Sequence, residues 1–221
     1  MLKRLIPLLV LSSCAIADEH ADLVALFERW RAFEQPPLLQ GAPDYTQTQF
    51  QRREAEFEAL RATLNSMEIA GWPVSEQVDW HLVRAEMNGY DFNRRVLMPW
   101  ARDPAFYNTI WTYRSDVPAH EGPTHHAVVE LWQYEFPLSE AAEARLAREL
   151  SVIPPLFAQA RKNLTGNARD LWITGIRDVR SDIVDLDNIE SQLPESASEA
   201  LRIAIAEARV AAVDLVAWLE S

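Results

Sequence analysis

Hydrophobic residues recur at three- and four-residue spacing through nearly every stretch of this chain between its prolines and glycines. This period is typical of amphipathic helices, and nowhere do hydrophobic and polar residues alternate for long enough to predict a strand. The helices are expected within residues 23–33, 44–67, 74–98, 103–114, 124–135, 139–164, 167–193 and 196–219. We therefore predict an all-α fold, a bundle of about seven or eight helices.

Local signals set several of the expected helix boundaries. Asp103 before a proline, and Ser139 before two glutamates, are typical of helix starts. Ser196 and Glu199 have the spacing of a capping box. Pro154, followed by a second proline, predicts a kink within residues 139–164.

The stretch WPVSEQVDWHLVRAEMNGYDFNRR, residues 72–95, is apolar on two sides when wound as a helix. One side carries Val78, Leu82, Ala85, Gly89, Phe92 and Val96, and the other carries Trp80, Val83, Met87 and Tyr90. Such a helix lies between layers of a bundle, so Trp80 and Phe92 are expected in the core.

The polar margins of this helix admit two interpretations. Asp79 and Glu86 stand two turns apart on one margin, where they could act as metal ligands or as an acid and base pair. Asp91 and Arg95 have the spacing of an ion pair within the helix. We favour a scaffold role for the stretch, because bundle helices commonly carry such pairs at their margins.

A second candidate is HEGPTHH, residues 120–126, which holds three of the five histidines. It resembles the zinc signature H-E-x-x-H, but His120 and His125 are five apart and the Gly-Pro pair between them interrupts a helix. His120, Glu121, His125 or His126 could form a loop metal site. We favour a structural interpretation, because a histidine and a glutamate four residues apart, such as His126 and Glu130, usually lie on a solvated helix face. No serine-nucleophile elbow, phosphate-binding loop or dinucleotide motif is present.

Charge and composition narrow the class of protein further. The 21 basic and 33 acidic residues give a net charge of −12, which works against binding of nucleic acid. Six glycines and eight tryptophans favour long helices over turn-rich sandwiches or barrels.

The N-terminus has the layout of a secretory signal, with Lys3 and Arg4 before a short apolar run. Leu11 to Cys14 resembles a bacterial lipobox, in which Cys14 would be lipidated, whereas Ala15 to Ala17 suits an ordinary signal peptidase. We predict a signal over residues 1–17, a helical domain over residues 18–221, and export to the periplasm or anchoring through Cys14.

The runs VDWHLVRAEMNGYDFNRRVLMPWARDPAFY, residues 78–107, and WQYEFPLSEAAEARLARELSVIPPLFAQARKNLTGNARDLW, residues 132–172, resemble the N-terminal half of the bacterial domain-of-unknown-function 885 family. The resemblance implies a largely helical, exported protein, often a lipoprotein and typically more than twice this length. The second half of such proteins carries an H-E-x-x-P-G-H-H type motif that is typical of zinc metallopeptidases.

That motif is absent from this sequence, so the resemblance assigns no catalytic or metal-binding residue and no cofactor to the chain itself. Trp218 and Leu219 are still in helical register two residues from the end, which predicts a truncated sequence. We therefore expect the helical part of a zinc-metallopeptidase-like hydrolase, inactive without a C-terminal catalytic half that would bind zinc and a peptide substrate. The alternative is a complete helical lipoprotein that binds or scaffolds and has no enzymatic activity.

Overall fold

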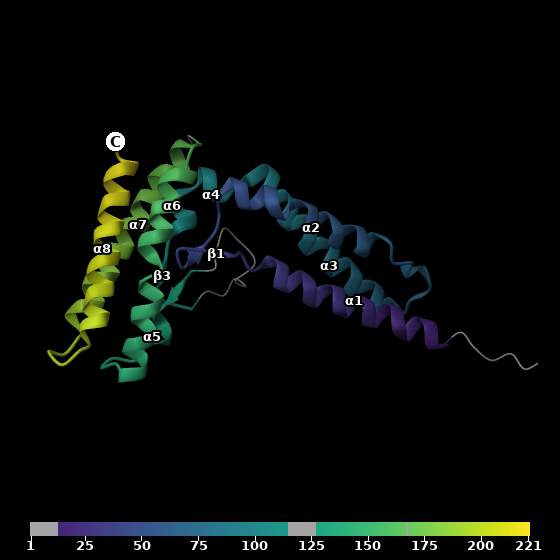
Figure 1. The fold of residues 1–221 in the computed structure, drawn as a ribbon, viewed down its shortest axis with the longest axis horizontal. Helices are drawn as coiled ribbons and strands as arrows, with labels where there is room; N and C mark the ends of the chain where they lie inside the picture. Colours follow the sequence, from purple (N-terminus) through teal and green to yellow (C-terminus); the bar gives the residue numbers. More distant parts are fainter. Residues whose placement is uncertain (1–12, 115–126, 167) are drawn as a thin grey trace, which may run out of the picture. The chain divides into compact units, whose positions relative to one another are not determined.

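The computed structural model describes residues 13–114, 127–166 and 168–221 (Figure 1). Side chains are described from His20 onward. Helices dominate the described part of the chain, which confirms the all-α prediction. Within the described residues, four strands of two residues each form two small pairs. β1 (Leu38–Leu39) is antiparallel to β2 (Ala42–Pro43), and β3 (Ile110–Trp111) is parallel to β4 (Val129–Glu130).

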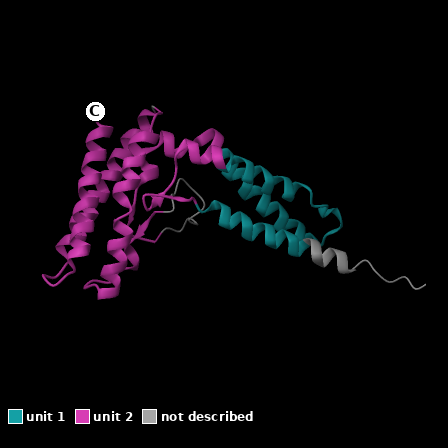
Figure 2. Ribbon diagram, viewed as in Figure 1, with its two compact units in different colours: residues 1–35, 53–92 teal, residues 36–52, 93–221 magenta. Residues whose placement is uncertain are grey.

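The chain divides into two compact units, residues 1–35 with 53–92 and residues 36–52 with 93–221 (Figure 2). The first unit contains α1 (Ser13–Glu34), most of α2 (Gln47–Asn65), the 3-10 turn η1 (Ile69–Gly71) and α3 (Val74–Phe92). The single helical domain expected for residues 18–221 thus has two separate hydrophobic cores.

Aromatic rings form the core of the first unit. Trp30 of α1 meets Tyr90 of α3 edge to face at 5.4 Å, and Phe33 stacks on Phe57 of α2 at 6.1 Å. The indole of Trp80 is also buried, and its Nε1 donates a hydrogen bond of 2.9 Å to the carbonyl of Leu64. These contacts join all three helices of the unit.

Only one of the two predicted apolar sides of α3 is covered. Trp80, Val83 and Met87 are buried, but Leu82 and Phe92 are 59% and 49% exposed. The prediction of Phe92 as a core residue is therefore wrong. Periodicity identified two apolar sides, but both neighbouring helices, α1 and α2, pack against the Trp80 side.

The second unit is built on four longer helices. They are α5 (Glu140–Leu150), α6 (Ile153–Asn163), α7 (Arg169–Ser191) and α8 (Glu199–Leu219), and α8 packs against the other three (Figure 1). The residues of α8 that recur at three- and four-residue spacing form a buried seam: Leu201, Ile205, Ala208, Ala212, Leu215 and Leu219. The two prolines, expected to kink one long helix, separate α5 from α6, which has proline in its first turn.

The connection before these helices is less helical than predicted. The π-helical turn η2 (Asn93–Leu97) and the short α4 (Pro99–Arg102) lead to the 3-10 turn η3 (Pro104–Tyr107). Asp103 caps η3 as expected, accepting from the amide of Ala105 at 2.9 Å, but the predicted helix over residues 103–114 ends at Tyr107. In place of the helix predicted for residues 124–135, the described part has β4 and the turn η4 (Leu131–Gln133).

The start of α8 also differs from the prediction. Its N-cap is Ser198, without a side-chain capping bond, so Ser196 and Glu199 do not form the predicted capping box. The amide of Ser198 instead donates 2.8 Å to the buried carboxylate of Glu143 on α5. A tertiary acceptor therefore replaces the local cap.

Candidate functional site

The sequence candidates for metal binding and lipidation cannot be placed in the described structure. His120, Glu121, His125 and His126 lie outside the described residues, and Cys14 lies in α1 where only the backbone is described. Among the described residues, no group of three or more histidines, cysteines or acidic residues is placed to hold a metal ion.

Asp79 and Glu86 each contact α1, at different residues. Asp79 lies 3.1 Å from the Nε2 of His20, whereas Glu86 accepts 3.2 Å from the indole Nε1 of Trp30 and lies 3.7 Å from Arg31. Each carboxylate thus ties α3 to α1. This arrangement supports the scaffold interpretation.

Asp91 is buried, and its carboxylate lies 3.4 Å from a guanidinium nitrogen of Arg61 on α2. The polar margins of α3 therefore bond to the two helices that flank it.

Asp182 is the most buried carboxylate of the described chain, at 1% exposure. It accepts from the amide and hydroxyl of Thr109 at 3.0 and 2.8 Å and from the amide of Ile110 at 3.1 Å. Burial raises the pKa of Asp182 to about 7, and the bonds from Thr109 and Ile110 oppose that rise. Almost fully buried, Asp182 holds the start of β3 against α7 through these three bonds.

Sequence reasoning missed Asp182, although its spacing offered a signal. The buried side of α7 runs through Gly175, Val179, Asp182, Leu186 and Ile189. Asp182 occupies a core position between Val179 and Leu186, and a carboxylate at such a position needs buried donors. The hydrophobic residues at helical spacing along α7 also include Trp172, Ile176 and Ile183, which are only partly buried.

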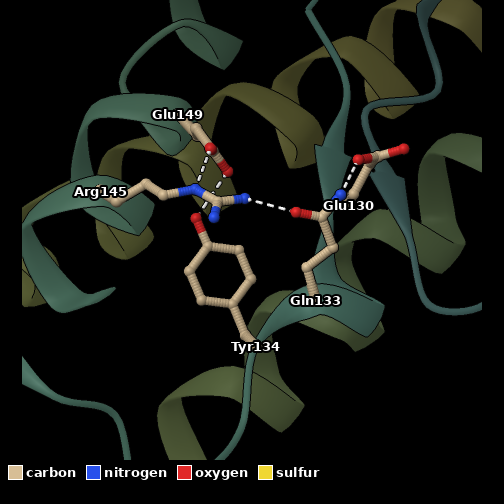
Figure 3. A network of polar contacts seen from close by, with 5 residues as sticks. All are labelled: Glu130, Gln133, Tyr134, Arg145 and Glu149. Atoms are coloured by element: carbon tan, nitrogen blue, oxygen red, sulfur yellow. Dashed lines mark hydrogen bonds and ion pairs between the residues drawn. The ribbon is translucent and has the colours of Figure 1, made fainter. Parts of the chain in front are cut away.

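A second polar network connects η4 to α5 (Figure 3). The hydroxyl of Tyr134 donates 2.7 Å to one carboxylate oxygen of Glu149, and Arg145 donates 2.8 Å to the other. Arg145 also donates 3.0 Å to Gln133, which in turn donates to Glu130 of β4.

This network restrains the segment that follows residues 115–126 rather than offering a reactive group. Burial, with the bond to Glu149, raises the pKa of Tyr134, so its hydroxyl stays protonated near neutral pH. The guanidinium of Arg145 lies 4.8 Å from the centre of the Tyr134 ring and adds a cation–π contact. Tyr134 and Arg145 are thereby held in place, and the segment that contains Gln133 and Tyr134 is bonded to α5.

The outer side of α8 carries apolar residues that the described chain leaves open. Ile203, Val210 and Val213 are 48%, 61% and 48% exposed, and they follow one another at helical spacing. Beside them lies a shallow groove between α6 and α8, lined by Pro154, Ala206, Glu207, Val210, Ala211 and Asp214. The carboxylates of Glu207 and Asp214 thus border an otherwise apolar groove.

No family model matches the chain, and no curated protein does so significantly. The fold is similar to the solved structure of a candidate lipoprotein of unknown function from Shewanella oneidensis, with a TM-score of 0.57 and 16% identity. The likeness covers 93% of this chain and 37% of the Shewanella chain. No described helix has the length and apolar composition needed to cross a membrane.

Proposed function

We propose that this chain is the helical, non-catalytic part of a longer exported protein, a zinc-metallopeptidase-like hydrolase that acts on peptides. The observation that supports a longer protein is the likeness to the Shewanella structure, in which nearly the whole of this fold corresponds to little more than a third of the chain. The hydrolase part of the proposal rests on the resemblance of residues 78–107 and 132–172 to the N-terminal half of a metallopeptidase-like family. That protein is described as a candidate lipoprotein, in keeping with the signal and the lipobox-like sequence before Cys14.

The polar contacts favour a structural rather than a catalytic role for the 221-residue chain. Asp79, Glu86 and Asp182 bond within the fold, and so does the network around Glu149. In the proposed protein, zinc bound by an H-E-x-x-P-G-H-H type motif in the remaining chain would activate the water that attacks a peptide carbonyl. The helices of this chain would form one wall of the cleft that binds the peptide substrate.

The second candidate function, a helical lipoprotein that binds or scaffolds without chemistry, is favoured by the open apolar side of α8. An exposed apolar stripe on a charged protein commonly marks a contact with another protein. In that case the chain would need no catalytic half.

The gene itself tests the proposal. We expect the reading frame to continue past codon 221 into an H-E-x-x-P-G-H-H type motif, and the longer product to retain one zinc after dialysis and to hydrolyse peptides. The 221-residue chain should do neither, because its clustered histidines have the wrong spacing for a helical zinc site. A frame without the motif, or tightly bound zinc in the 221-residue chain that is lost on replacing His120 and His125, would contradict it.

A further inference from the structure

The outer stripe of α8 has the geometry of a helix-docking surface. Ile203, Val210 and Val213 lie on one side of the helix, opposite its buried seam, over a length of about 15 Å. Alanines at positions 206 and 217 lie on the same side and are also exposed. Small residues between larger ones leave space for the side chains of a second helix.

The charged residues beside this stripe differ on its two sides. On one side, Arg202 donates 2.6 Å to the carbonyl of Pro194, and Arg209 forms ion pairs with Asp187 and Glu190 of α7. On the other side, Glu207 and Asp214 are exposed and border the groove. No ion pair of either carboxylate occurs within the described ranges. The charged residues that line the groove are therefore both acidic.

From this we propose that the groove between α6 and α8 binds an amphipathic helix with basic residues beside its apolar stripe, supplied by the remaining part of the same longer polypeptide. The inference rests on the proposed function, since the Shewanella protein with this fold has more than half of its chain outside the match. A second copy of this chain fits less well, because it would bring the same two carboxylates, and a net charge of −12, to the contact.

Thiol accessibility tests where that helix lies. Val210→Cys is introduced into the 221-residue chain and into the longer gene product, with Cys14 and any further cysteine replaced by serine. The matched control is Val184→Cys on α7, which is similarly exposed at 57% but has the polar neighbours Arg180, Ser181, Asp187 and Asn188 on its side of the helix.

Labelling with a maleimide reagent, followed by mass spectrometry, should separate the two sites. In the longer protein, a docked helix should slow labelling of Val210→Cys by about tenfold or more relative to the 221-residue chain, whereas the rate for Val184→Cys should not change. Adding Glu207→Lys and Asp214→Lys should restore fast labelling of Val210→Cys, because the basic partner would then be repelled.

Equal labelling of Val210→Cys in the two proteins would overturn the docking site, while the zinc and peptidase results would still decide the proposed function. A 221-residue chain that is dimeric by light scattering, and becomes monomeric with Val210→Glu, would identify a second copy as the occupant instead. A gene that ends at codon 221 would overturn both proposals together.

Discussion

Two aromatic residues of α3, Trp80 and Phe92, have different surroundings and should respond differently to truncation. Trp80 is 8% exposed within the core of the first unit, and its indole hydrogen bonds to α2. We expect Trp80→Ala to lower the free energy of unfolding by about 3 to 5 kcal/mol. Phe92→Ala, which removes a half-exposed ring, should cost less than about 1 kcal/mol.

Urea denaturation of the two variants, followed by far-UV circular dichroism, measures both effects. Equal losses of stability would show that the open side of α3 is covered in solution. The comparison therefore also tests whether α3 has one packed side or two.

Asp182 predicts a pH dependence of stability. Its pKa is about 7 in the folded protein, against an ordinary value of 3.8. A carboxyl group whose pKa is raised by folding stabilises the fold at pH values below its unfolded pKa, and this contribution is lost as the pH rises to its folded pKa. The stability of the wild type relative to Asp182→Asn should therefore fall between pH about 4 and about 7, by at most about 1.4 kcal/mol per pH unit.

The difference between the two proteins isolates this titration, because all other carboxyl groups are common to both. Urea unfolding at several pH values provides the measurement. A difference that stays constant or grows over this range would mean that Asp182 is ionised throughout, held by the donors of Thr109 and Ile110.

At the scale of elements, α7 approaches η3 closely at Gly175. A Cβ atom at Gly175 would lie 2.5 Å from the amide nitrogen of Ala105 and 2.6 Å from the Cβ of Pro104. We expect Gly175→Ala to destabilise the protein by about 1 to 3 kcal/mol, because the 3-10 turn must move away from the helix.

Gly89 of α3 is the matched control, since a Cβ atom there has no neighbour within 4 Å. Gly89→Ala should stabilise the protein by about 0.5 to 1 kcal/mol through helix propensity alone. Thermal melts of the two variants should shift in opposite directions. Shifts of the same sign would contradict the close approach of η3 to α7.

At the scale of the whole molecule, the signal-like N-terminus predicts where the protein is found. If Cys14 is lipidated, the protein should remain with the membrane fraction after cell lysis, held by its acyl chains. Cys14→Ser should move it to the soluble fraction, or leave an uncleaved precursor. A wild-type protein that is already fully soluble in the periplasm would instead indicate ordinary cleavage after Ala17.

The amino-acid sequence alone was sufficient to predict the class of fold and most helices. Leu201, Ile205 and Ala208 repeat at helical spacing, and a repeat of this kind creates an apolar side that must be buried wherever the helix packs. The start of α5 was also predictable from the sequence. The hydroxyl of Ser139 accepts a hydrogen bond from the amide of Ala142, which is a contact between neighbours in sequence.

Tertiary structure alone decided the features that depend on distant residues. The segment after Tyr107 is extended because Asp182, more than seventy residues away, accepts the backbone donors that a helix would have used. Phe92 is exposed because α1 and α2 pack on the opposite side of α3. Periodicity shows which side of a helix is apolar, but which partner covers that side depends on how the helices are arranged in space.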